Sequence, residues 1–477
     1  MSTYSQYGVI SIVFSSLTFL YFFLPMFLVL YFLTPMPKGS ASLRNGVILL
    51  ASLLFYAWAE PIFVLILIGQ CVTSWCFGLL IGKYRGKPIC KVILAASISL
   101  DLGVLLLFKY ADFFVLNFNA ALGTNITLLR LILPVGISFY TFQMLSYTID
   151  LYRGKIQVNR NLLNFATFVS MFPQLVAGPI VRYAEVENDL ERRKHRVEDI
   201  AAGLRRFVVG LGKKVLIANT MGELIQHYTS SEENAVLFSW MYVTAFALQI
   251  YFDFSGYSDM AIGLGRVLGF KFPENFNYPY IAKSLTEFWR RWHMTLALWF
   301  RDFLFIPLGG SRVKPLRYVF NVVLIWFLIG FWHGAAWNFI IWGLYFAAVL
   351  LLEKYVLGKY LDKLPAFVGR GWVLFSVLIT AVFFNAYSFT EIGETLSRLF
   401  GLGESSFAGA ESLYYFRSFF VPLLLGIIGS TPLPKMLADK AIKKFRVLEP
   451  IGMTVILLIS TAFLVDGSFN PFIYFRF

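Results

Sequence analysis

The chain has 477 residues, of which 58% are hydrophobic, 18% aromatic and only 14% charged. Soluble proteins carry about 25% charged residues, so this composition and a mean hydropathy of +0.69 exclude an ordinary soluble enzyme and predict a polytopic membrane protein. The formal net charge is +14, but the basic residues stand in short loops between apolar runs and no nucleic-acid-binding motif accompanies them. We therefore expect them to orient the protein and meet membrane lipids, with no nucleic-acid partner.

Apolar runs long enough to cross a bilayer fill most of the N-terminal half of the chain. The first, 9–32, is followed by Lys38 and Arg44, so the positive-inside rule places the N-terminus outside. Further crossings are predicted over residues 45–57, 61–82, 91–116, 128–151, 207–225 and 235–252.

Residues 162–181 are also apolar, but Pro173, Gly178 and Pro179 break the run and both of its flanks are basic. Broken backbone at membrane depth is tolerated only where protein or water satisfies it, so we predict a re-entrant element here. The charged segment 182–206 that follows is predicted to form an amphipathic cytoplasmic layer in which His195 is solvated.

Polar residues repeatedly interrupt the apolar runs between residues 251 and 312. No uninterrupted span of about 20 residues fits, so we expect short helices that line a polar pocket. Asp253 and Asp259 are better explained by helix capping or by pairing with nearby arginines than by catalysis. Residues 162–312 are thus predicted to form the re-entrant and cytoplasm-facing pocket region of a single membrane domain, 1–477.

An imidazole interrupts the apolar run 316–352, within Phe331-Trp332-His333-Gly334. An ionisable group at that depth costs several kcal/mol unless it faces protein, water or substrate, so His333 is the main candidate for catalysis. The alternative is a structural histidine bonded to a neighbouring helix. His293, upstream in Phe288-Trp289-Arg290-Arg291-Trp292-His293, pairs with His333 only if the fold brings the two together.

Three more crossings are predicted near the C-terminus, over 372–387, 416–428 and 451–464. The loop charges then give about 12 crossings with both termini outside, and the aromatic tail 472–477 lies on the outer face. The three cysteines show no metal-ligand spacing, and we expect no metal site.

Several motifs occur in order along nearly the whole chain and together resemble those of one family. They are Val13-Phe14-Ser15-Ser16, Leu133-Pro134-Val135-Gly136-Ile137-Ser138-Phe139-Tyr140, Phe172-Pro173-Gln174-Leu175, Ala177-Gly178-Pro179, Asp253-Phe254-Ser255-Gly256-Tyr257-Ser258-Asp259, Asn275-Phe276-Asn277-Tyr278-Pro279-Tyr280 and the two histidine motifs. The chain resembles the bacterial membrane-bound O-acyltransferase (MBOAT) family, in the branch of the alginate O-acetyltransferases. This branch also holds peptidoglycan and cellulose acetylation proteins and the teichoic acid D-alanyl-transfer protein.

The resemblance implies a ring of helices around a central funnel, with His333 catalytic and His293 its partner. It implies that an acyl group, expected to be acetyl, passes from acetyl-CoA or another cytoplasmic thioester across the bacterial inner membrane for O-acetylation of a cell-envelope polysaccharide or exopolysaccharide. The implied recipient is a periplasmic or extracellular serine-type acyltransferase.

The residue types suit this chemistry. Neutral imidazole, with an ordinary pKa near 6.5, can take the proton of an acceptor hydroxyl, so His333 is the expected general base. His293 could orient it, bind the donor thioester or protonate the leaving thiolate. Arg290, Arg291 and Arg301 are candidates for holding the donor's phosphates, although they could equally anchor lipid headgroups.

The tail Phe472-Ile473-Tyr474-Phe475-Arg476-Phe477 is similar to a C-terminal aromatic motif found in this branch or on its small partners. Tyr474 is therefore a candidate acyl relay, because an aryl ester of a phenol with a pKa of about 10 keeps much of a thioester's reactivity. The alternative is an aromatic anchor at the membrane interface.

Two other functions fit the composition. One is direct acylation of a lipid or a lipidated protein. The other is a transporter of a polysaccharide or lipid-linked intermediate, which would also have broken spans and a polar midplane. The ordered motifs favour the enzyme that acts on a polysaccharide.

Overall fold

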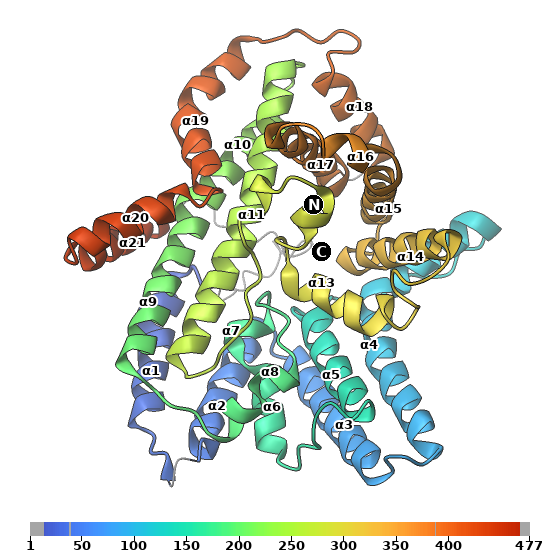
Figure 1. Cartoon of the computed structure of the whole chain (residues 1–477), viewed down its shortest axis with the longest axis vertical. Helices are drawn as coiled ribbons and strands as arrows, with labels where there is room; N and C mark the ends of the chain where they lie inside the picture. The colour runs from blue at the N-terminus through green and yellow to red at the C-terminus, as the bar shows by residue number, and fades with distance from the viewer. Residues whose placement is uncertain (1–13, 38–39, 387, 468–477) are drawn as a thin grey trace. The chain divides into compact units, whose positions relative to one another are not determined.

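The computed structural model (Figure 1) describes residues 14–37, 40–386 and 388–467. Apart from one isolated bridge between Ala235 and Ser406, the described residues contain helices and no β-structure. Within these ranges nine helices are long and apolar enough to cross a membrane, and a shorter apolar helix covers Phe19–Leu33. The predicted all-α polytopic membrane class is confirmed, with fewer such helices in the described ranges than the predicted 12 or so crossings.

The chain divides into two compact units, Met1–Phe207 with Asp259–Pro273, and Val208–Ser258 with Glu274–Phe477. The first contains α1 (Leu24–Leu33), α2 (Ser42–Ala59), α3 (Phe63–Lys83), α4 (Ile89–Leu122), α5 (Ile137–Tyr152), α6 (Leu162–Ser170), α7 (Phe172–Leu175) and α8 (Tyr183–Glu191). The chain passes between the units within α9 (Val197–Gly212) and again within α11 (Val236–Val267).

Helix α5 is the central element of the first unit, where it packs against α3 and α4 and is buried along almost its whole length. The predicted crossing 128–151 was wrong at its start, because the helix begins only at Ile137. Pro134 precedes it, and Gly136 adopts a left-handed conformation (φ +77°) that few other residues accept. A β-carbon at Gly136 would also lie 2.6 Å from the carbonyl oxygen of Leu175, so the site requires glycine.

The predicted break within 162–181 is present. Helix α6 ends at Ser170, Met171 is extended (ψ 112°), and the short α7 follows with Pro173 in its first turn. Met171, Phe172 and Leu175 are fully buried, so protein surrounds this broken backbone, as the membrane setting requires.

The prediction that His195 is solvated was wrong. Its Nε2 lies 2.8 Å from the hydroxyl of Tyr31, and its Nδ1 lies 3.2 Å from Nη1 of Arg44. Desolvation, followed by the positive charges of Arg44 and Arg193, lowers the pKa of this loop histidine to about 4. His195 is therefore half-buried in a polar cluster, in which Tyr31 also donates to the carbonyl of Leu268 (2.7 Å).

The second unit contains α10 (Asn219–Ser230), α14 (Pro315–His333), α15 (Trp337–Leu352), α16 (Gly358–Leu361), α17 (Ala366–Asn385), α18 (Phe389–Leu399), α19 (Ala410–Gly429), α20 (Leu433–Lys444) and α21 (Leu448–Val465). Within it α14 packs on α15, α15 on α17, and α10 on α19 (Figure 1). The short helices predicted for residues 251–312 occur only over 274–312, where they include α12 (Leu285–Trp289) and α13 (Met294–Phe300), because residues 251–267 belong to α11.

The predicted end of a crossing at Phe252 was wrong, because α11 continues without interruption to Val267. Its two acids are paired rather than exposed to lipid. Asp253 forms an ion pair with Lys214 (2.8 Å), and Asp259 forms one with Arg206 (2.8 Å). The expected pairing with an arginine is thus confirmed for Asp259, whereas the cation beside Asp253 is a lysine.

Candidate active site

His333 is the last residue of α14, where the helix stops at Gly334 in an extended conformation. A side chain at position 334 would collide with the ring of Phe339, so glycine permits the close return of the chain into α15. The imidazole therefore projects from a helix end held against the next helix.

Two further glycines bring α14 and α15 together. A β-carbon at Gly330 would meet the carbonyl oxygen of Phe339, and one at Gly343 would meet the carbonyl oxygen of Trp326. Small residues at facing positions allow two membrane helices to approach closely. This packing fixes the end of α14 and, with it, the position of His333.

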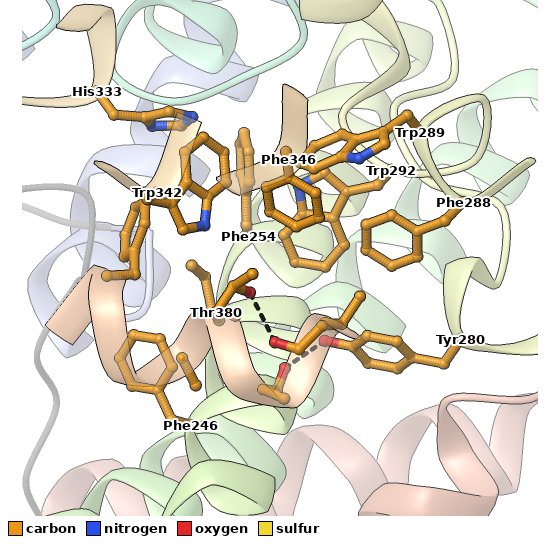
Figure 2. Close-up of a pocket in the computed structure, with 15 residues that line it drawn as sticks. Phe246, Phe254, Tyr280, Phe288, Trp289, Trp292, His333, Trp342, Phe346 and Thr380 are labelled. Carbon is orange, nitrogen blue, oxygen red and sulfur yellow. Dashed lines mark hydrogen bonds between the residues drawn. The ribbon is translucent and has the colours of Figure 1, made fainter. Parts of the chain in front are cut away.

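Aromatic rings surround the imidazole of His333, which is only 9% exposed. Its centroid lies 4.9 Å from the ring of Trp342, 5.0 Å from that of Trp332 and 5.4 Å from that of Phe384. His333 lines a cavity of about 60 Å³ whose other lining residues are mainly aromatic. Figure 2 shows His333 among these rings. A neutral imidazole in this position could act as a base.

Two hydroxyl groups also line this cavity, and both already donate to the backbone. Tyr280 donates to the carbonyl of Ala247 (2.6 Å), and Thr380 donates to that of Val377 (2.6 Å) (Figure 2). Their protons are engaged within the protein. His333 is therefore the side chain of this cavity best suited to proton transfer.

His293 precedes α13 and is 2% exposed. It adopts a left-handed conformation (φ +44°), which is uncommon for a residue other than glycine and marks a constrained site. Its Nδ1 lies 3.0 Å from Oδ1 of Asn275, and its ring meets that of Phe254 edge-on at 4.6 Å. A backbone hydrogen bond also connects the segments that contain His293 and Asn275, since the N–H of Met294 donates to the carbonyl of Asn275 (2.9 Å).

The two histidines lie close enough for the charge on one to affect the pKa of the other. The ring of His293 lies 6.3 Å from that of Trp332, the residue before His333. His293 lies outside the candidate spans, and burial, followed by the influence of His333, holds its pKa well below the usual value. The predicted partner of His333 is therefore a neutral imidazole close to it.

A larger cavity, of about 1030 Å³, is lined by both apolar and charged side chains of the second unit. Its basic members are Lys283, Arg290, Arg301, Lys354 and Lys359. A narrower cavity of about 150 Å³ shares Trp289, Arg301 and Trp326 with it and is lined by His293. Trp289 also lines the cavity beside His333.

The three arginine candidates differ in their surroundings. Arg290 and Arg301 line the basic cavity, although Arg301 also pairs with Asp302 (2.7 Å). Arg291 does not line it: it forms an ion pair with Glu287 (2.8 Å) and donates to the carbonyl of Asn277 (3.0 Å). Arg291 is thus engaged in local structure.

Tyr474, the candidate acyl relay, lies outside the described residues. No group of three or more His, Cys, Asp or Glu suited to a metal ion occurs in the parts of the chain that the structure describes. No role was predicted for Asn275, although it lies in one of the ordered motifs. Its burial beside His293 depends on the tertiary fold, so the only available signal was a polar amide in an otherwise aromatic stretch.

These features define a multi-pass helical membrane protein with a buried histidine site beside a basic cavity. The model of the MBOAT, membrane-bound O-acyltransferase family matches residues 156–389. The probable alginate O-acetylase AlgI of Azotobacter vinelandii is 40% identical over 400 residues, which cover 82% of this chain and 79% of that protein. The probable alginate O-acetylase AlgI of Pseudomonas putida is 37% identical over 493 residues, with 98% and 100% covered.

A third relative, the peptidoglycan O-acetyltransferase of Helicobacter pylori, is 34% identical over 424 residues, with 82% of this chain and 80% of that protein covered. The chain belongs to the membrane-bound O-acyltransferase family, and it is an O-acyltransferase. The resemblance inferred from the ordered motifs is confirmed.

Proposed function

We propose that the protein takes an acetyl group from a cytoplasmic thioester, such as acetyl-CoA, and passes it across the bacterial inner membrane for O-acetylation of an exopolysaccharide or cell-envelope polysaccharide. The relatives named for alginate and peptidoglycan acetylation support a polysaccharide as the final acceptor. The observation that carries the proposal is the pair of buried histidines, with His333 in an aromatic cavity and His293 in a cavity that adjoins a large basic one.

The basic cavity is suited to the donor. A CoA carries several phosphate groups, and guanidinium groups bind phosphate through charge-assisted hydrogen bonds. Arg290 and Arg301 would hold these phosphates, while the pantetheine arm extends into the narrower cavity beside His293. The thioester then lies near the histidine pair.

In the chemical step, His333 takes the proton of an acceptor hydroxyl while its oxygen forms a bond to the acyl carbon. The carbon–sulfur bond breaks as the tetrahedral intermediate collapses. The proton on His333 then moves to the departing sulfur, which leaves a free thiol and a neutral imidazole.

Tyr474 is the proposed acceptor hydroxyl on this chain, and the aryl ester that it forms would hand the acetyl group to a periplasmic or extracellular serine-type acyltransferase. That partner would acetylate the polysaccharide, because a cavity of about 60 Å³ is too small for a glycan. This step requires the C-terminal tail on the outer side of the membrane, as the loop charges predict.

The test is the intact mass of the purified protein after incubation with isotopically labelled acetyl-CoA, followed by peptide mapping. We expect label on Tyr474 in the wild type and no label in His333→Ala or Tyr474→Phe. His227→Ala and Tyr414→Phe are matched controls, because both residues are exposed and distant in sequence from the site, and these variants should label normally.

Cells that carry Tyr474→Phe should also lose polysaccharide acetylation while the protein still inserts into the membrane. Undiminished acetylation in these cells would overturn the relay. Retention of label in His333→Ala would overturn the role of this histidine as the base.

A further inference from the structure

Asn275 is completely buried and contacts the ring of His293. Its Oδ1 lies 3.0 Å from Nδ1 of His293, and it accepts hydrogen bonds from the hydroxyl (2.9 Å) and the backbone N–H (3.3 Å) of Thr295. Its Nδ2 donates to the hydroxyl of Ser258 in α11 (3.1 Å). The carboxamide is thus fixed on both of its ends.

These contacts determine which nitrogen of His293 carries the proton. A backbone N–H can only donate, so the atom of Asn275 that faces Thr295 must be the carbonyl oxygen. The same oxygen faces Nδ1 of His293 and has no proton to give, so Nδ1 must be the donor. In the neutral ring, Nε2 is then left with a lone pair.

The Nε2 atom is buried and has no hydrogen-bond partner among the residues that the structure describes. Its ring lines the narrow cavity that it shares with Trp289 and Arg301. The titratable and charged groups near it are therefore His333 and Arg301. Both groups are positively charged when protonated. Positive charge nearby favours an Nε2 that accepts a hydrogen bond through its lone pair over an Nε2–H that donates one.

We propose that Asn275 is a positioning residue that fixes His293 as the Nδ1–H tautomer, so that Nε2 can accept a hydrogen bond or a proton but cannot donate one. This inference rests on the proposed acyl transfer and deepens it. Of the three roles that the sequence left open for His293, protonation of the leaving thiolate by the neutral ring is excluded. The lone pair of Nε2 instead stabilises the imidazolium that forms when His333 takes the acceptor's proton.

The tautomer can be measured without any catalysis. The chain has four histidines, so the full-length protein labelled with ¹⁵N-histidine in lipid nanodiscs gives few ring signals, and His293→Gln identifies those of His293. We expect His293 to show a protonated Nδ1 and an unprotonated Nε2. Asn275→Ala should lose this preference, whereas Thr295→Val should keep it, because the bond between Asn275 and His293 remains. A protonated Nε2 in the wild type would overturn the proposal even if the acyl transfer stands.

Kinetics then separate positioning from a purely structural role. Asn275→Ala should lower kcat about 10- to 100-fold, as loss of a residue that orients a functional histidine does, with KM for acetyl-CoA changed by less than about two-fold. Asn275→Asp keeps an acceptor for Nδ1 and should recover most of kcat. Its negative charge favours the protonated ring, so the acid limb of the kcat–pH profile should move to higher pH.

Ser258→Ala is the control, because it removes only the bond at the opposite end of the amide, and its kcat should stay near that of the wild type. An equal loss in Ser258→Ala and Asn275→Ala would mean that the amide merely supports the fold. Wild-type kcat in Asn275→Ala would also overturn the proposal.

Discussion

The residue that holds His293 is an amide and not a carboxylate. A carboxylate beside Nδ1 would stabilise the protonated ring, whereas a carboxamide accepts the same hydrogen bond without adding charge. In a site where burial and His333 already disfavour a charged ring, the amide keeps His293 both oriented and neutral. Asn275 therefore suits the proposed mechanism, in which both histidines begin each cycle unprotonated.

The arginines of the basic cavity allow a direct test of donor binding. Arg290→Gln and Arg301→Gln should raise KM for acetyl-CoA about ten-fold, because a hydrogen bond between a guanidinium and a phosphate contributes on the order of 1.5–3 kcal/mol. Arg291→Gln should change KM by much less, because Arg291 is paired with Glu287 and does not line the cavity.

A truncated donor sharpens this comparison. Acetyl-pantetheine has no nucleotide phosphates, so its KM should be the same in the wild type and in Arg290→Gln. An equal effect on both donors would show that Arg290 supports the fold and does not bind phosphate.

The sequence was sufficient to single out His333, because an imidazole in an apolar run carries a cost that function or pairing explains. His293 was singled out by the resemblance to the family. The sequence could not assign Asn275 or distinguish Arg291 from its neighbours. Both depend on which side chains meet after folding: Asn275 contacts a histidine 18 residues away, and Arg291 finds Glu287 one helical turn before it.

At the level of helices, the boundaries were misjudged where a charge is neutralised by a distant residue. The crossing that was expected to stop at Phe252 continues through Asp253 and Asp259, because Lys214 and Arg206 supply opposite charges. A hydropathy pattern treats each acidic residue as unfavourable in the membrane. It does not take account of a basic residue elsewhere in the chain that neutralises the acid in the folded protein. The backbone features around Gly136, in contrast, are local, but the predicted crossing 128–151 ran through Pro134 and Gly136 and therefore started too early.

The close contact between α14 and α15 predicts that Gly343, which has no side chain, is needed for stability and activity. Gly343→Val should push the helices apart, since the added carbon would collide with the carbonyl of Trp326. Overpacking of this kind costs about 1–3 kcal/mol, so the thermal unfolding midpoint in detergent should fall, and acetyl transfer should fall with it as His333 shifts. Gly371→Val in α17 is the matched control, because a β-carbon there meets open space. If both variants unfold at the same temperature, the close packing of α14 on α15 is not what fixes the site.

For the whole molecule, composition alone was enough to identify a polytopic membrane protein, and the ordered motifs were enough to identify the family. The exact set of crossings was harder to obtain, because α4 is 34 residues long and α6–α7 is broken, so neither resembles one standard span. The division into two compact units, with α9 and α11 passing between them, leaves no trace in the hydropathy pattern.

Orientation in the membrane can be tested with single cysteines in a chain that lacks Cys71, Cys76 and Cys90. Glu404→Cys lies in the acidic segment before α19, and Lys440→Cys lies in the basic helix α20; both positions are exposed. The positive-inside rule predicts that a membrane-impermeant maleimide labels position 404 in cells with a permeabilised outer membrane, and position 440 only after lysis. The reverse pattern would contradict the proposed direction of acyl transfer.

The aromatic lining of the cavity beside His333 also bears on how much of the proposed acyl donor would be lost to hydrolysis. An ordered water needs two to four polar partners, but the hydroxyl protons of Tyr280 and Thr380 are already committed to backbone carbonyls. In the proposed reaction, so apolar a lining would keep most water away from the reacting acyl group, and this would slow the competing hydrolysis of the donor. The acetyl group of the proposed donor would then reach its acceptor with little loss to hydrolysis.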